Sequence, residues 1–191
     1  LSAPPGLTML SVSGDALKAM VDRKTPIASF YCNILTFKDY YTQKWFPYTM
    51  PISDIIRLNK AVKNVYFDKT VFERHSVIAE ASRKAVKAAG LTLYPDCGYS
   101  DTVTVVNVPE MLTDDQILDT MRDDYNILLA GSFDMLSGKV FRIGHMGENA
   151  NIRDMAETFQ ALDKTFAKLE YPLKASMYEV FMDEINKNVI Y

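Results

Sequence analysis

The sequence predicts an α+β fold in which a layer of helices packs on a small, largely antiparallel sheet. Two long stretches between residues 52 and 89 repeat apolar side chains at helical spacing. After Gly90 the pattern changes to short runs rich in β-branched residues. In the second half of the chain the predicted elements follow one another as strand, strand, helix, strand, strand, helix, an order that favours one antiparallel sheet covered by helices.

The composition is that of a globular protein with a sizeable core. The 191 residues are 48% hydrophobic and 24% charged, and the net charge is −3. This charge excludes the strongly basic surface typical of nucleic-acid-binding proteins, and no apolar run reaches the length of a membrane span. Cys32 and Cys97 lack the spacing of metal ligands. We therefore expect no zinc site, and we expect a reducing, cytoplasmic environment.

The first 51 residues combine turns with short elements. Residues 2–7 are rich in proline and glycine, which break regular structure. Alternating apolar and hydroxyl side chains in residues 8–13 predict a half-buried strand, and residues 15–21 predict a helix. Residues 25–51 are rich in aromatic side chains, which we expect to cover a core or a subunit surface because Tyr and Trp favour places with one dry and one wet side.

Two consecutive helices are predicted next. The apolar spacing indicates helices over residues 52–67 and 71–89, with a break at residues 68–70 and Gly90 as the cap of the second helix. His75 lies in the second helix without an acid–base partner near it in sequence. We interpret it as a surface histidine or one with its hydrogen bonds satisfied within the helix.

The remaining elements are marked by their caps and by their apolar periods. Thr113 and Gln116 form a capping box, and Asn151 precedes Asp154 at the start of another helix. Ser132 falls in a glycine-bounded loop. The predicted strands are residues 91–94, 102–108, 126–130 and 139–144, and the predicted helices are residues 114–124, 151–169 and 173–188.

The strand that begins at Lys139 carries an arginine in an apolar setting. Val140 and Arg142 should lie on one side of it, and Phe141 and Ile143 on the other. A buried guanidinium without a partner is costly, so Arg142 must either reach solvent or bind an anion. Taken alone, an edge-strand arginine with its head in water is the commoner case. The glycines at 144 and 147 are expected to turn the backbone sharply after this strand.

The run Lys139-Val140-Phe141-Arg142-Ile143-Gly144-His145-Met146-Gly147 resembles the signature of class V pyridoxal-phosphate aminotransferases, the alanine–glyoxylate and serine–pyruvate group. In that family the arginine of the Arg-Ile-Gly triplet holds the substrate carboxylate, which implies the same role for Arg142. Two further segments agree in order: an Ala-Pro-Pro-Gly segment, residues 3–6, and Phe46-Pro47-Tyr48-Thr49-Met50-Pro51.

This resemblance implies an α/β fold of type I, with residues 1–65 as the end of the large cofactor-binding domain and its linking helix, and residues 66–191 as the C-terminal small α+β domain. It also implies a pyridoxal 5′-phosphate cofactor and a homodimer with the active site at the subunit interface. The lysine that carries the cofactor is expected just upstream of Leu1, so the partner of this chain is the N-terminal half of the same fold. An interruption of the sequence at a modified lysine is favoured over a protein that is split into two chains.

The second matching segment implies a contact with the cofactor phosphate of the other subunit. Thr49 occupies the position of the phosphate-binding hydroxyl before Pro51. Some family members carry a tyrosine three residues before this threonine, where Phe46 has no hydroxyl, and Tyr48 is a weak substitute. Without the resemblance, Thr49 would be interpreted as capping the turn before the next helix.

The resemblance implies transamination between a small amino acid, such as alanine or serine, and a 2-oxo acid such as glyoxylate or pyruvate. One alternative is a non-catalytic α+β binding domain that needs no lysine. Another is a different reaction on the same fold, such as β-elimination, 2-aminoethylphosphonate transamination or cysteine desulfuration. Desulfuration requires a reactive loop cysteine, but neither Cys32 nor Cys97 has a basic neighbour in sequence to lower the pKa of its thiol.

Overall fold

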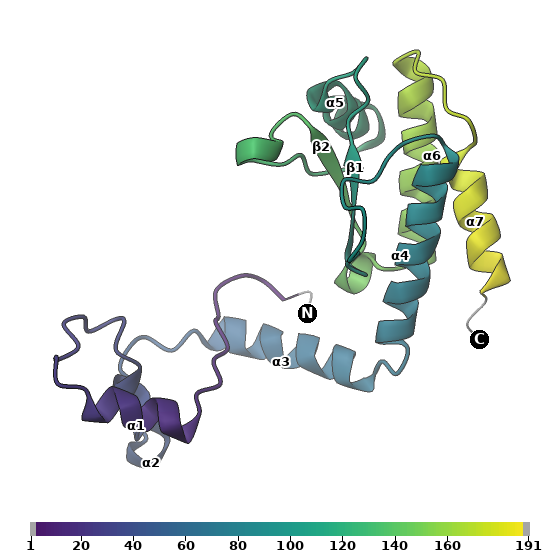
Figure 1. Ribbon diagram of the computed structural model, residues 1–191. Coiled ribbons are helices and arrows are strands. Elements are labelled where there is room, and N and C mark those ends of the chain that lie inside the picture. The colour runs from purple at the N-terminus through teal and green to yellow at the C-terminus, as the bar shows by residue number, and fades with distance from the viewer. Residues whose placement is uncertain (1–2, 189–191) are drawn as a thin grey trace. The chain divides into compact units, whose positions relative to one another are not determined.

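The computed structural model of the protein describes residues 3–188. The chain divides into two compact units, Leu1–Tyr66 and Phe67–Tyr191 (Figure 1). The first unit contains the helices α1 (Gly14–Asp22) and α2 (Tyr40–Gln43), the short 3-10 helix η1 (Ile34–Phe37) and nearly all of α3 (Ile52–Phe67).

The first unit has little interior. The Ser13 hydroxyl accepts a hydrogen bond from the Ala16 amide and so caps α1, as expected for a serine before a helix. Six aromatic rings between Phe30 and Tyr48 touch one another edge to face, tilted or stacked. Among the described residues up to Tyr66, however, only Ala61 is buried.

The strand predicted for residues 8–13 is wrong. These residues have no regular secondary structure, and the side chains of Met9 and Leu10 are 62% and 67% exposed. A strand requires a partner for its backbone hydrogen bonds, and none of the residues from 3 to 188 pairs with this segment. The helix predicted for residues 15–21 is confirmed as α1.

The second unit alternates helices with two strands. Its elements are α4 (Val71–Ala88), β1 (Val103–Asn107), α5 (Asp114–Tyr125), η2 (Asp134–Leu136), β2 (Val140–Gly144), η3 (Gly147–Asn149), α6 (Ile152–Lys168) and α7 (Met177–Lys187). The predicted capping box at Thr113 and Gln116 is present, and the Asn151 side chain accepts from the Asp154 amide at the start of α6. Both helices therefore start where the sequence indicated.

The sheet of this unit has two strands, with a single bridged residue beyond each edge. The strands β1 and β2 are antiparallel, with Val105 opposite Arg142. Leu93 bridges β1 and Ala130 bridges β2, each as an isolated pair. The strands predicted for residues 91–94 and 126–130 are thus reduced to one paired residue each. Asn126 adopts a left-handed conformation, φ 55°, as the cap of α5, which removes the first residue of the latter strand.

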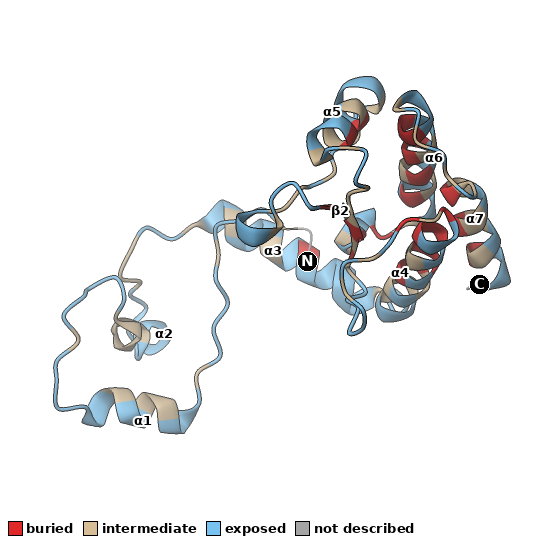
Figure 2. Ribbon diagram, turned by 45° about the horizontal axis from the view of Figure 1, so that its top comes forward, coloured by how far each residue is buried: buried red, intermediate tan, exposed pale blue. Residues whose placement is uncertain are grey.

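One face of the sheet is buried beneath the helices. Thr104 and Val106 on β1, with Phe141 and Ile143 opposite them on β2, are at most 2% exposed. The Phe141 ring contacts Phe166 of α6 at 6.5 Å between centroids, and α7 packs against both α4 and α6 (Figure 1). Figure 2 shows the buried residues gathered on these helices and strands. None of the helices that the structure describes has the length and apolarity needed to cross a membrane.

Candidate functional site

Arg142 lies on the opposite, more open face of the sheet. Its cross-strand neighbour Val105 and the residues beside it on β1, Val103 and Asn107, are half-buried rather than buried. Arg142 itself is half-buried. The predicted alternation of β2 is confirmed for Phe141 and Ile143, which are buried beneath the helices, and for Arg142, which is not. Val140, expected on the same side as Arg142, is nevertheless only 1% exposed.

The side chain of Arg142 is held on one edge. Its Nε donates a hydrogen bond of 2.7 Å to the Gly131 carbonyl, and its Cζ lies 5.9 Å from the centroid of the Phe133 ring. Across residues 3–188 no carboxylate comes within ion-pair distance of this guanidinium. The half-buried charge therefore has its Nη atoms available for an anion, which is the chemistry that an arginine fork serves best.

A cavity of about 680 Å³ borders Arg142. Residues 126–130, Met146 and the first turns of α6 line it, and α6 contributes the carboxylates of Asp154 and Glu157. Both carboxylates already have partners, since Asp154 accepts from the Asn151 side chain at 2.7 Å and Glu157 accepts from Arg153 at 3.2 Å. The volume falls in the range of small-molecule sites, and Arg142 is the cation that lines it.

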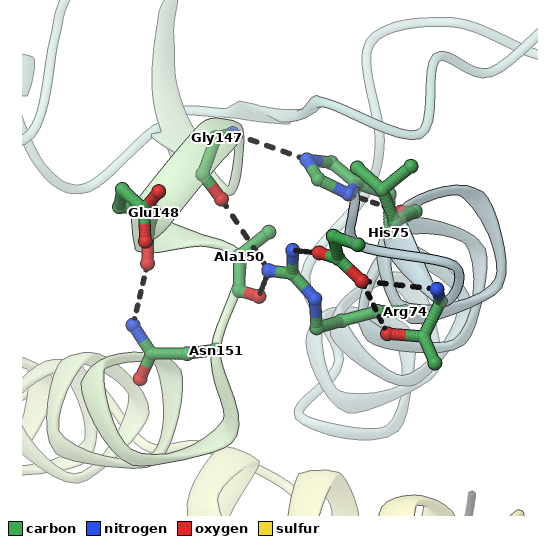
Figure 3. Close-up of polar contacts among 9 residues, drawn as sticks. Arg74, His75, Gly147, Glu148, Ala150 and Asn151 are labelled. Carbon is green, nitrogen blue, oxygen red and sulfur yellow. Dashed lines mark hydrogen bonds and ion pairs between the residues drawn. The ribbon is translucent and has the colours of Figure 1, made fainter. Parts of the chain in front are cut away.

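The turn after β2 is fastened to the start of α4 (Figure 3). Arg74 Nη1 donates to the carbonyls of Gly147, at 3.4 Å, and Ala150, while its Nη2 donates to Asp68 Oδ2 at 2.6 Å. The hydrogen bond from Arg74 is the largest cause that lowers the pKa of Asp68. Arg74 had not been predicted to take part in the site, because the contact joins residues more than 70 positions apart.

His75 completes this attachment. Its Nδ1 lies 2.6 Å from the Val71 carbonyl, and its Nε2 accepts a hydrogen bond of 3.1 Å from the Gly147 amide. Because a carbonyl can only accept, the proton is on Nδ1. The interpretation of His75 as a histidine with satisfied hydrogen bonds is confirmed, although one partner comes from outside the helix. Of the two glycines expected to turn the backbone after β2, Gly147 has the left-handed conformation, φ 63°, whereas Gly144 continues the strand, so the turn expected at Gly144 is wrong.

His145 is the buried residue of the motif. Its Nε2 lies 2.9 Å from the Thr104 hydroxyl and its Nδ1 lies 3.2 Å from the Asp101 carbonyl. Burial lowers the pKa of His145 below its ordinary value of 6.5, and the hydrogen bond to Asp101 only partly opposes that shift. The ring is therefore neutral near pH 7. Its hydrogen bond to Thr104 joins the segment that follows β2 to β1.

Thr49 and Tyr48 belong to the first unit. The Thr49 side chain is exposed, and no hydrogen bond joins its hydroxyl to another described residue. The Tyr48 hydroxyl donates to the Phe30 carbonyl at 3.3 Å, and its ring stacks on Tyr31. Thr49 does not cap α3, whose first amides bond to the Met50 and Pro51 carbonyls. The Thr49 hydroxyl is thus available to a ligand, and the Tyr48 hydroxyl already has a partner.

Most of the known proteins that this chain resembles are named as aminotransferases, and two are named as subunits of soluble hydrogenases. No family profile matches the chain. An uncharacterized aminotransferase of Methanocaldococcus jannaschii is 31% identical over 191 residues, which cover 98% of this chain and 49% of that relative. The serine–glyoxylate aminotransferase of Methylorubrum extorquens is 35% identical over 78% of this chain and 39% of its own length.

The fold agrees with these relatives. The crystal structure of pyridoxamine–pyruvate aminotransferase from Mesorhizobium loti superposes with a TM-score of 0.87 and 28% identity, over 98% of this chain and 49% of that one. The predicted type I fold is thereby confirmed. The chain spans about half the length of the relatives it matches. These relatives are class V aminotransferases, and the match over nearly the whole of this chain is that of a C-terminal half of their fold.

Proposed function

We propose that the protein is a pyridoxal-phosphate-dependent aminotransferase that moves an amino group between a small amino acid, such as alanine or serine, and a 2-oxo acid such as glyoxylate or pyruvate. The observation that carries the proposal is Arg142, a half-buried cation at a cavity of small-molecule size, with no carboxylate partner among residues 3–188. Both substrate classes carry a carboxylate. The aminotransferase names of the relatives support the same reaction.

Arg142 is proposed to bind that carboxylate through its two Nη atoms. Two parallel charge-assisted hydrogen bonds fix the orientation of the acid as well as its position. Orientation matters because the Cα–H bond that breaks must stand at a defined angle to the cofactor. The grip of the guanidinium therefore contributes to reactivity in addition to affinity.

Thr49 is proposed to donate its hydroxyl to the phosphate of pyridoxal 5′-phosphate. The exposed hydroxyl without a partner among the described residues suits this group, and Tyr48 is at most a secondary contact because its hydroxyl donates to Phe30. When bound, the cofactor supplies an electron sink for the negative charge that develops at the substrate Cα.

The lysine that carries the cofactor is proposed to lie upstream of Leu1. Lys18 pairs with Asp22, and Lys84 pairs with Glu80 and Glu184. Hydrogen bonds from Glu184 and Glu80 raise the pKa of Lys84, which opposes the deprotonated form that a nucleophilic amine needs. Neither lysine has the surroundings of a catalytic amine.

Residues 1–65 are proposed to end the large domain, and residues 66–191 to form the small domain. The exposed aromatic side chains between residues 30 and 45 support a homodimer that covers them. The free thiols of Cys32 and Cys97 are both exposed, which supports a cytoplasmic protein.

Transamination by the whole protein tests the role of Arg142. Arg142→Lys should raise the KM for alanine or serine about tenfold or more, because an ammonium cannot form the planar fork. The absorbance of the bound cofactor should persist. Arg153→Lys is the matched control, since the Arg153 side chain is 85% exposed and forms an ion pair with Glu157. An unchanged KM for Arg142→Lys, or a whole protein that binds no pyridoxal phosphate, would contradict the proposal.

Removal of the Thr49 hydroxyl tests the phosphate contact. Thr49→Ala should weaken cofactor binding by about 1.5–3 kcal/mol, the range for a hydrogen bond to a charged group. The measurement is a titration of the cofactor-free protein with pyridoxal phosphate, with Thr42→Ala, another exposed threonine of the first unit, as control. Equal affinities of the two variants would remove Thr49 from the site.

A further inference from the structure

We propose that Phe133 is a positioning residue, which holds the guanidinium of Arg142 so that its two Nη atoms, and not its Nε edge, receive the substrate carboxylate. This inference rests on the proposed function of Arg142. It concerns the loop of residues 131–138, between the single bridged residue Ala130 and β2.

The hydrogen bond of Nε decides which edge of the guanidinium remains free. A guanidinium can grip a carboxylate through Nε and one Nη, or through both Nη atoms. In Arg142 the Nε–H already donates to the Gly131 carbonyl at 2.7 Å. A carboxylate that arrives can therefore form two parallel hydrogen bonds only with Nη1 and Nη2.

The ring of Phe133 fixes the plane of the same group. Its centroid lies 5.9 Å from Cζ of Arg142, within the range of a cation–π contact. The ring is 71% exposed, so packing in the core does not explain its position. An aromatic side chain over a functional cation reduces the number of rotamers that the cation must abandon when a ligand binds.

The backbone of the loop is bent at the position that brings the ring there. Asp134 directly follows Phe133 and has φ 52°, the left-handed region that non-glycine residues seldom adopt. The Leu136 amide donates to the Phe133 carbonyl at 3.2 Å and the Ser137 amide donates to the Asp134 carbonyl at 3.2 Å, which closes a tight 3-10 turn. A turn closed by these two hydrogen bonds limits the directions in which the Phe133 side chain can point.

The experiment compares substrate binding in variants of the whole, cofactor-loaded protein. Phe133→Leu keeps an apolar side chain but removes the ring, whereas Phe133→Tyr keeps the ring. Met135→Leu is the matched control, because Met135 lies in the same loop and is 84% exposed. The KM and kcat for alanine are measured, together with the Kd of propionate, which has the carboxylate but no amine and cannot react.

Loss of the ring should raise both the KM for alanine and the Kd of propionate roughly two- to fivefold, with kcat unchanged. Phe133→Tyr and Met135→Leu should match the parent protein. In an Arg142→Gln background, Phe133→Leu should cause no further change, because the ring acts through the guanidinium.

Two results separate the inference from the proposed function. If Arg142→Gln weakens propionate binding and Phe133→Leu does not, the role of Phe133 is wrong and that of Arg142 stands. If Arg142→Gln itself leaves propionate binding and the KM unchanged, the carboxylate site is wrong and the inference falls with it. An equal loss from Phe133→Leu in both backgrounds would show that the ring supports the loop rather than the cation.

Discussion

The two units of the chain differ in how far their apolar side chains are buried. In Phe67–Tyr191, aromatic and aliphatic residues from four helices and both strands form one buried cluster. In Leu1–Tyr66 the side chains of Tyr31, Tyr41 and Trp45 are 79%, 84% and 53% exposed. A protein does not gain stability from apolar area that remains in water. The second unit thus contains its own stabilising core. The stability of the first unit depends on the burial of its exposed apolar side chains against other surfaces.

Separation of the units should give the largest effect. A fragment of residues 67–191 should fold cooperatively, whereas a fragment of residues 1–66 should not, because it buries too little apolar area to offset its conformational entropy. Dispersion of amide signals in NMR spectra and urea unfolding curves measure this. A cooperative transition in the fragment of residues 1–66 would contradict the comparison.

Truncation of one core ring should have the next largest effect. Phe159 is fully buried and lies 5.0 Å from the ring of Phe181. Phe159→Ala should lower the free energy of unfolding by about 3–5 kcal/mol. Phe72→Ala is the matched control, because Phe72 is also helical but 87% exposed, and it should change the free energy by at most about 0.5 kcal/mol. Urea denaturation measures the free energy of unfolding of both variants. Similar decreases in the two would show that burial does not govern stability here.

A decrease in pH should produce the smallest of the three effects. Burial lowers the pKa of His145 in the folded protein, and the positive charge of Arg83 and the proximity of His75 lower it further. The unfolded chain therefore binds more protons below pH 6.5. The stability contributed by neutral His145 is fully present above pH 6.5 and is lost as pH falls towards the lower, folded-state pKa.

The slope of the unfolding free energy against pH measures this contribution. Between pH 7.5 and 5.5 the parent protein should lose stability more steeply than His145→Asn, by up to about 1.4 kcal/mol per pH unit, the limit for one titrating group. Equal slopes for the parent protein and His145→Asn would show that His145 does not titrate in this way.

The elements predicted correctly are those whose signals are local. The helices α3, α4, α5 and α6 agree with the apolar period and the capping residues to within two residues. The helix predicted from residue 173 instead begins at Met177, since Asp163 of α6 accepts hydrogen bonds from the Ser176 hydroxyl and the Met177 amide. The start of α7 is thus set by a residue on another helix, which a local pattern cannot reveal.

The candidate site divides along the same line. The alternation of β2 predicted the face on which Arg142 lies, and the position of His75 in a helix predicted that its hydrogen bonds would be satisfied. The contacts of Arg142 with Gly131 and Phe133 were not predictable, because they depend on the path of the loop of residues 131–138, which a local pattern does not specify. The roles of Arg142, Thr49 and Tyr48 stay predictions until substrate and cofactor binding are measured.

The early end of pairing beside β2 has a consequence for the arginine. Ala130 exchanges both backbone hydrogen bonds with Arg142, at 2.7 and 3.3 Å, and the chain then leaves the sheet. The next carbonyl along the chain, that of Gly131, accepts a hydrogen bond from the side chain of Arg142. Two neighbouring peptide groups thus bind one arginine by its main chain and by its side chain, so any shift of the loop at this edge would move the cation with it.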